Sequence, residues 1–143
     1  MAISKTFHIE SEDALHGVAA DLAPYLEKGA LIALEGDLGA GKTAFSRALI
    51  RYLCGDTTLD VPSPTFTLLQ TYDTPKGEVW HFDLYRLKDP EEVFELGWED
   101  ALATANLVLV EWPARIGTLL PHDAIHITLT PEGTNGRLIE VRG

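Results

Sequence analysis

The apolar positions of this chain predict several strands. Continuous apolar runs at residues 31–34 and 107–110 are typical of strands that are buried on both faces of a sheet. Shorter or alternating apolar stretches predict further strands at residues 6–9, 66–72 and 78–84. Two pairs of strands are expected to form hairpins. The turn residues are Pro75-Lys76-Gly77 in the middle of the chain and Asn135-Gly136 near its end.

Apolar residues at helical spacing predict helices between these strands. The first helix follows Ser11, a plausible N-cap, and Pro24 should kink it or end it early. Its apolar face contains Leu15, Val18, Ala19, Leu22 and Leu26. A second helix is expected after residue 42, with its apolar face formed by Phe45, Ala48, Leu49, Tyr52 and Leu53. Asp89-Pro90 predicts the start of a short third helix.

This order of elements predicts an α/β fold with a mixed β-sheet flanked by helices. Helices alternate with strands early in the chain, whereas hairpins occupy its middle and its end. The length of 143 residues suits one domain, so residues 1–143 are expected to form a single unit.

A glycine-rich segment joins the strand at residues 31–34 to the second helix. It reads Gly36-Asp37-Leu38-Gly39-Ala40-Gly41-Lys42-Thr43 and matches the P-loop pattern G-x-x-x-x-G-K-[ST]. Its glycines allow the backbone N–H groups to turn toward phosphate oxygens at the positive end of the helix. Lys42 is expected to bind the β- and γ-phosphates, and the Thr43 hydroxyl is expected to bind Mg²⁺. The segment therefore predicts a P-loop NTPase-like fold that binds a polyphosphate group.

Two acidic residues come at the ends of predicted strands. Glu111 follows the apolar run at residues 107–110, where an acid of a P-loop enzyme can hold Mg²⁺. Asp83 belongs to His81-Phe82-Asp83-Leu84-Tyr85-Arg86 and could orient or deprotonate an attacking water. The alternatives are that Glu111 only starts a loop and that Asp83 pairs with Arg86. We interpret His81 as structural rather than catalytic.

Other residues are candidates for sensing the nucleotide or for contacting a partner. Thr65, in Pro62-Ser63-Pro64-Thr65, lies where small GTPases keep a segment that responds to the γ-phosphate, although a plain stiff loop fits the prolines equally well. Trp112 follows Glu111 and suits either the core or a nucleotide or partner contact. The acidic residues in the segment 89–100 suit a solvated helix face or a surface for a basic partner.

Composition and charge exclude several function classes. The net charge of −11 disfavours tight direct binding to nucleic acid, because phosphate neutralisation by basic residues normally supplies much of that affinity. No apolar run is long enough to span a membrane. His8 and Glu10 stand where a secretory signal would be apolar, and the only cysteine is Cys54, so we expect a cytoplasmic protein.

Four segments in order resemble the TsaE family of small P-loop ATPases, formerly called YjeE-type. They are GDLGAGKT, PSPTFT, HFDLYRL and LVEWP, and the similarity extends from about Leu31 to Pro113. The resemblance implies a cytoplasmic Mg²⁺-dependent ATPase that acts with TsaD-type and TsaB-type proteins. These proteins attach threonylcarbamoyl to the adenosine next to the anticodon of tRNA, and the family is not itself the transferase.

The resemblance also implies roles for individual residues. The P-loop at residues 36–43 would bind the nucleotide, ATP or ADP, and includes Gly36, Gly39, Ala40 and Gly41. The residues that would bind Mg²⁺ are Thr43 and Glu111, and those of the catalytic set are Lys42, Thr65, Asp83 and Glu111. Further nucleotide contacts are expected at Glu12, Ala44, Trp112 and Gly136. The family usually has threonine where this chain has Ala44, which removes a possible hydrogen bond to the α-phosphate.

Two other functions fit the P-loop. A small-molecule kinase would need an acceptor pocket and usually a lid that carries arginines, but the arginines here are dispersed. A nucleotide-sensing module without hydrolysis is the third possibility, against which Asp83 and Glu111 argue mildly. A GTPase is disfavoured because the sequence has no [NT]-K-x-D motif.

Overall fold

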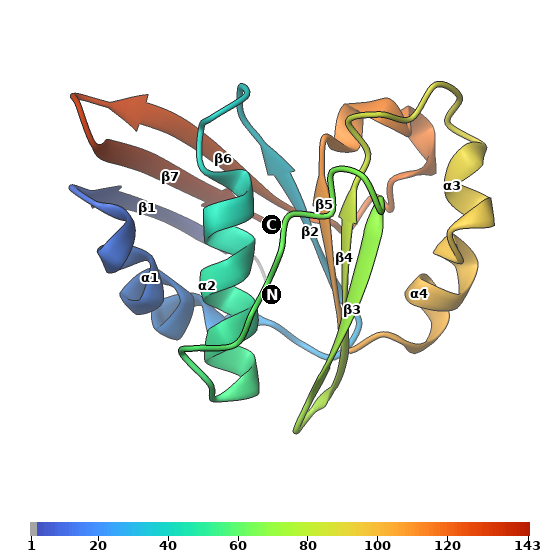
Figure 1. The fold of residues 1–143 in the computed structure, drawn as a ribbon, viewed down its shortest axis with the longest axis horizontal. Coiled ribbons are helices and arrows are strands. Elements are labelled where there is room, and N and C mark those ends of the chain that lie inside the picture. The colour runs from blue at the N-terminus through green and yellow to red at the C-terminus, as the bar shows by residue number, and fades with distance from the viewer. Residues whose placement is uncertain (1–2) are drawn as a thin grey trace.

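The strands form one mixed sheet. The computed structural model describes residues 3–143, and Figure 1 shows its elements. The strand order in the sheet is β1-β7-β6-β2-β5-β4-β3. The parallel centre consists of β2 (Ala30–Glu35), β4 (Gly77–Asp83), β5 (Leu107–Glu111) and β6 (Ile125–Glu132). Three strands run antiparallel to their neighbours, namely β1 (Ser4–Ile9), β3 (Leu69–Thr74) and β7 (Gly136–Arg142).

Helices cover both faces of the sheet. Figure 1 shows α1 (Leu15–Leu22) and α2 (Lys42–Cys54) on one side, and α3 (Glu92–Glu95) and α4 (Trp98–Thr104) on the other. The 3-10 turns are η1 (Glu12–Ala14), η2 (Ala23–Tyr25), η3 (Pro113–Arg115) and η4 (Gly117–Leu119). None of the helices within residues 3–143 has the length and apolar character needed to cross a membrane.

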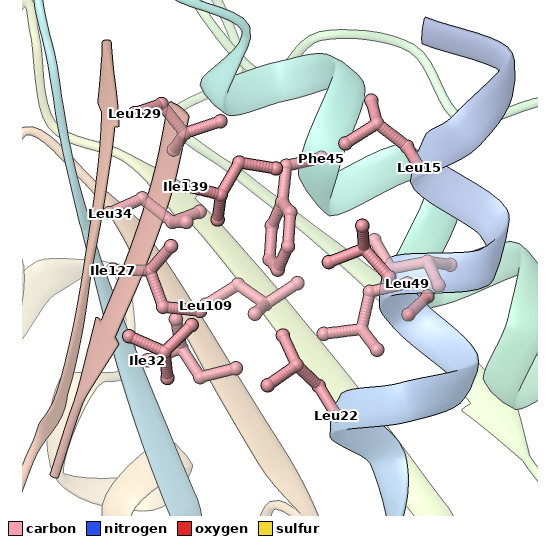
Figure 2. Packing of buried hydrophobic residues seen from close by; sticks show 14 of the residues in the cluster. Leu15, Leu22, Ile32, Leu34, Phe45, Leu49, Leu109, Ile127, Leu129 and Ile139 are labelled. Atoms are coloured by element: carbon pink, nitrogen blue, oxygen red, sulfur yellow. The ribbon is translucent and has the colours of Figure 1, made fainter. Parts of the chain in front are cut away.

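Alternating side chains of the central strands supply two hydrophobic clusters. Ile32 and Leu34 of β2 pack with α1 and α2, whereas Ala33 packs on the opposite face with α3 and α4. Figure 2 shows Phe45 and Leu49 of α2 pointing into the first cluster. Fully burying a large apolar side chain stabilises the fold by about 1.5–3 kcal/mol. These contacts fix the orientation of α2, whose first residues belong to the P-loop.

The fold class predicted from the sequence is confirmed. The sheet is mixed and is flanked by helices, and both predicted hairpins are present. Helix α1 ends at Leu22, and Pro24 lies in the 3-10 turn that follows it.

Several predicted boundaries are wrong. Strand β3 begins at Leu69 rather than at residue 66, because Leu68 has a positive φ of 68° and its N–H donates to Pro64 O in a turn. Helix α3 begins at Glu92, after a turn that starts at Asp89. Ser11 precedes η1 but forms no side-chain cap hydrogen bond. Helix α4 was not predicted from the sequence.

The register of the parallel strands brings the predicted site residues together. Glu111 at the end of β5 pairs with Leu34 of β2 on one side and with Asp83 of β4 on the other. The P-loop follows β2 directly, so both acids lie at the sheet edge where α2 begins. The loop between α2 and β3 is held against α2, because Arg47 Nε donates to Val61 O and Arg51 Nε donates to Leu59 O.

Candidate functional site

The P-loop has the backbone conformation that its glycines allow. Gly36, Gly39 and Gly41 have positive φ angles of 152°, 80° and 104°. Gly41 is the N-cap of α2, so Lys42 and Thr43 are the first two residues of that helix. The loop and the helix N-terminus therefore form a concave backbone of the kind that binds phosphate groups.

Lys42 is the cation of the P-loop and is almost completely buried. Its ammonium group donates to the carbonyl oxygens of Gly36 and Asp37, and it lies 4.1 Å from the centroid of the Trp112 ring. Burial lowers the pKa of Lys42, while the charges of Glu111, Asp83 and Asp37 oppose that shift. A bound polyphosphate would place further negative charge next to this ammonium group and would favour its charged form.

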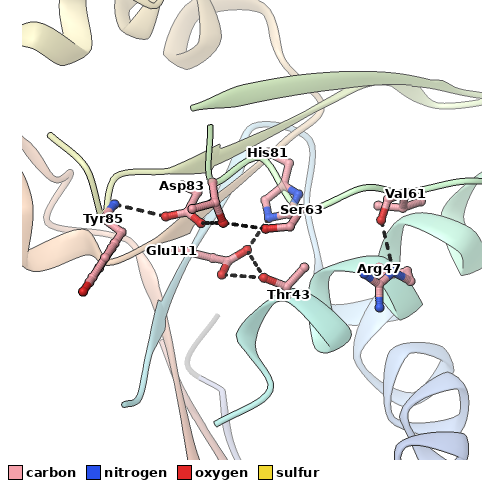
Figure 3. Close-up of polar contacts among 9 residues, drawn as sticks. Thr43, Arg47, Val61, Ser63, His81, Asp83, Tyr85 and Glu111 are labelled. Atoms are coloured by element: carbon pink, nitrogen blue, oxygen red, sulfur yellow. Dashed lines mark hydrogen bonds and ion pairs between the residues drawn. The ribbon is translucent and has the colours of Figure 1, made fainter. Parts of the chain in front are cut away.

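Glu111 joins the end of β5 to the start of α2. The Thr43 hydroxyl donates to Glu111, at 2.9 Å from Oε1 and 3.1 Å from Oε2. His81 Nε2 lies 2.7 Å from Oε2 of the same carboxylate, which is buried. Figure 3 shows the three side chains meeting from β4, β5 and α2.

Asp83 forms a second group of polar contacts close to the first. One oxygen accepts a hydrogen bond from the Thr65 hydroxyl at 3.1 Å, and the other accepts from the Tyr85 N–H at 3.0 Å. The Thr65 and Ser63 hydroxyls are 2.7 Å apart. Burial raises the pKa of Asp83, and the hydrogen bond from Tyr85 N–H counteracts that shift. A carboxylate with a raised pKa is a better proton acceptor, which suits a general base.

Trp112 occupies a strained backbone position directly after Glu111. Its φ of 61° and ψ of 52° are left-handed, and a bulky residue held in this region costs about 1–3 kcal/mol. The indole ring packs against Tyr85, with ring centroids 5.0 Å apart, and faces the Lys42 ammonium group on another side. Strain of this kind is often concentrated at functional sites.

These residues line one cavity of about 380 Å³. Ten of the predicted site residues line it: Glu12, Gly39, Gly41, Lys42, Thr43, Ala44, Thr65, Asp83, Glu111 and Trp112. Gly36 and Ala40 do not line it, but their carbonyl oxygens accept from Lys42 and Arg137. Gly136 also lies outside the lining, where a side chain would collide with the carbonyl oxygens of Glu132 and Ile9.

Three cavity residues outside the predicted P-loop were not singled out from the sequence. They are Arg47, Tyr85 and Arg137, whereas Leu38 belongs to the P-loop itself. Arg47 lies one helical turn after Thr43, so helical spacing could have identified it. Arg137 follows the predicted Asn135-Gly136 turn, but only the sheet order places it beside the P-loop. Its Nε donates to Ala40 O at 2.8 Å.

The oxygen ligands suit Mg²⁺ bound together with a nucleotide. Thr43 and Glu111 supply one hydroxyl and one carboxylate in mutual contact, and the described residues contain no group of three or more His, Cys, Asp or Glu side chains that could hold a metal. Mg²⁺ usually takes one or two carboxylates and completes its coordination with substrate phosphates and water. The residues therefore fit a nucleotide-linked Mg²⁺ rather than a cation bound by protein side chains alone.

Comparisons with known proteins identify the family of this chain. Residues 9–139 match the family model of the threonylcarbamoyl adenosine biosynthesis protein TsaE. The tRNA threonylcarbamoyladenosine biosynthesis protein TsaE of Rickettsia conorii is 45% identical over 133 residues, which are 93% of this chain and 75% of that protein. Its namesake in Bacillus subtilis is 35% identical over 122 residues, covering 85% of this chain and 75% of that protein.

A solved structure supports the same assignment. The crystal structure of Bacillus subtilis YdiB superimposes with a TM-score of 0.79 at 26% identity, covering 100% of this chain and 87% of that one. This likeness over the whole chain confirms the predicted fold class. The family model and the relatives each cover most of the chain, and this chain therefore belongs to the TsaE family of threonylcarbamoyl adenosine biosynthesis proteins.

Proposed function

We propose that this protein binds ATP with Mg²⁺ in the P-loop cavity and hydrolyses it to support threonylcarbamoyladenosine modification of tRNA next to the anticodon, at position 37. The modification itself would be made by TsaD-type and TsaB-type partners in the cytoplasm. The names of the relatives support the pathway. The observation that carries the ATPase proposal is the convergence of Lys42, Thr43, Asp83 and Glu111 on one cavity.

Each of these residues has a role that follows from its contacts. Lys42 would bind the terminal phosphates, exchanging its present backbone carbonyl partners for phosphate oxygens. Thr43 and Glu111 would hold Mg²⁺. When bound, this ion would neutralise part of the phosphate charge. Asp83 would orient or deprotonate the attacking water, because its carboxyl lines the same cavity and burial raises its pKa.

The arrangement of the cavity favours an ATPase over a kinase. Its volume of about 380 Å³ is near the lower end of the range for small-molecule sites, about 300–1,000 Å³. A cavity of this size suits a single small-molecule ligand. Arg47 and Arg137 line the cavity, but each donates through Nε to a backbone carbonyl within the fold rather than extending from a lid.

Charge supports a role that is exerted through other proteins. The chain has 22 acidic and 11 basic side chains, so we expect only weak binding to tRNA at physiological salt. Trp112 contacts Lys42 and also packs on Tyr85, which gives a packed connection from the phosphate site to a neighbouring loop. We expect Trp112→Ala to impair partner-stimulated hydrolysis more than basal hydrolysis.

The test is an ATPase assay with and without the partner proteins, alongside an anisotropy titration with tRNA. The proposal predicts slow basal hydrolysis that the partners accelerate and tRNA binding that salt abolishes. Turnover that the partners leave unchanged, or tight salt-resistant tRNA binding by the protein alone, would contradict it. Phosphate transfer to a small acceptor would favour the kinase, and nucleotide binding without any hydrolysis would favour the sensing module.

A further inference from the structure

His81 is a completely buried polar side chain that the proposed chemistry does not use directly. It lies on β4 with none of its surface exposed, and its Nε2 is 2.7 Å from Oε2 of Glu111. The register pairs His81 with Leu109, two residues before Glu111 on the neighbouring strand. The His81 ring therefore extends from β4 to the last residue of the neighbouring strand β5.

The contacts of the ring indicate which nitrogen carries the proton. An ionised carboxylate only accepts hydrogen bonds, so Nε2 must donate to Glu111. Nδ1 is buried and has no partner within residues 3–143. A buried N–H group without an acceptor would cost about 1–3 kcal/mol, whereas protonation at Nε2 leaves only a lone pair on Nδ1. The ring thus has a single donor, and that donor is directed at Glu111.

This hydrogen bond constrains the orientation of the Glu111 carboxylate. His81 Nε2 contacts Oε2 of Glu111. The Thr43 hydroxyl is closer to Oε1, at 2.9 Å, than to Oε2, at 3.1 Å. A glutamate side chain otherwise has several rotamers, and fixing one of them costs entropy. Because the carboxylate contacts His81 and Thr43 at once, its orientation toward Thr43 is fixed by two hydrogen bonds.

We propose that His81 is a positioning residue, which fixes the Glu111 carboxylate in the orientation needed to hold Mg²⁺ together with Thr43. The inference rests on the proposed function, because it concerns the same metal-binding pair. Groups that orient metal ligands through a hydrogen bond typically change metal affinity by 10–100-fold when they are removed. His81 acts through Glu111 and is not predicted to touch the nucleotide.

The test compares His81→Gln with His81→Phe. Glutamine places an amide N–H at the same number of bonds from Cα as His81 Nε2, whereas phenylalanine keeps a ring without a donor. The readout is the ratio of the ADP dissociation constant in EDTA to that in excess Mg²⁺, measured by calorimetry. We expect this ratio to fall by about 10–100-fold in His81→Phe and to stay within about threefold of the unchanged protein in His81→Gln.

Val79→Ala is the matched control for general loosening of β4. Val79 is also fully buried, and it lies two residues before His81 on the same face of the strand. This control should lower the melting temperature and leave the ratio unchanged. In a Glu111→Gln background, His81→Phe should have no further effect on the ratio.

Several results would overturn the inference. The first is an unchanged ratio of ADP dissociation constants in His81→Phe, and the second is an equal fall of that ratio in Val79→Ala. The third is a further fall of the ratio when His81→Phe is added to Glu111→Gln. If His81→Phe does not fold, His81→Met takes its place. The nitrogen NMR spectrum of the unchanged protein must also show the His81 proton on Nε2, and a proton on Nδ1 alone would overturn the proposal. If the unchanged protein shows no Mg²⁺-dependent nucleotide binding, the proposed function fails instead.

Discussion

Gly36→Ala tests whether the first residue of the P-loop must be glycine for the fold to pack, in addition to any role in phosphate binding. A Cβ at this position would lie 2.6 Å from Leu129 O and 3.0 Å from the Ala40 Cβ. The carbonyl oxygen cannot easily retreat, because β6 lies between β2 and β7, with Leu129 paired to Ile139. The φ of Gly36, 152°, is also one that side-chain-bearing residues rarely adopt.

The expected cost follows from these two effects. Backbone strain at one residue costs about 1–3 kcal/mol, and forcing an extra carbon into a packed region costs about 1–3 kcal/mol more. Gly36→Ala should therefore lower the free energy of unfolding by about 2–6 kcal/mol. For a chain of this size, that change lowers the melting temperature by roughly 5–20 °C.

Urea unfolding of the nucleotide-free protein, followed by circular dichroism, measures this cost directly. Gly17→Ala is the matched control, because Gly17 lies in α1 and an added Cβ would meet no atom within 4 Å. That control should stabilise the protein by up to about 1 kcal/mol, since alanine is the better helix former. A Gly36→Ala protein as stable as the unchanged protein would refute the packing argument.

The site residues carry three other predictions. Burial raises the pKa of Asp83 in the folded protein above its value in the unfolded chain. Protonation of Asp83 therefore stabilises the fold at pH values below the unfolded pKa, and this stabilisation is lost as the pH rises through the folded pKa. Asp83→Asn should therefore raise the melting temperature at neutral pH but not at acidic pH, and an equal gain at both would contradict this. Lys42→Ala should abolish ATP binding in calorimetry and leave the circular dichroism spectrum unchanged; normal hydrolysis by this folded variant would rule out the P-loop role. Trp112→Gly should be more stable than Trp112→Ala by about 1 kcal/mol in urea, because glycine tolerates the φ of 61°, and equal stabilities would disprove strain there.

Local patterns in the sequence predicted the P-loop and the two acidic residues at strand ends that lie beside it. Glu111 and Asp83 were identifiable because acids at the carboxyl ends of adjacent parallel strands meet at one edge of a sheet. The glycine spacing likewise predicted the loop conformation at Gly39 and Gly41.

The residues that were missed depend on contacts between distant segments. Arg137 reaches Ala40 O because β7 pairs with β6, which lies beside β2, and no local pattern states that order. Helix α4 was missed although Trp98 is fully buried, because the acidic residues around it indicate a solvated surface. Phe66 was predicted to begin a strand, yet the residue is 81% exposed in the turn before β3.

The most direct test of the account is the Mg²⁺ dependence of ATP binding in Glu111→Gln. Calorimetry with a non-hydrolysable ATP analogue in EDTA and in excess Mg²⁺ should show tighter binding with the metal for the unchanged protein. Glu111→Gln should lose this gain. Glu35→Gln, the same change at the exposed end of the neighbouring strand β2, should keep it. No binding by the unchanged protein, or a full Mg²⁺ effect in Glu111→Gln, would contradict the central claim that this cavity binds Mg²⁺ and ATP together.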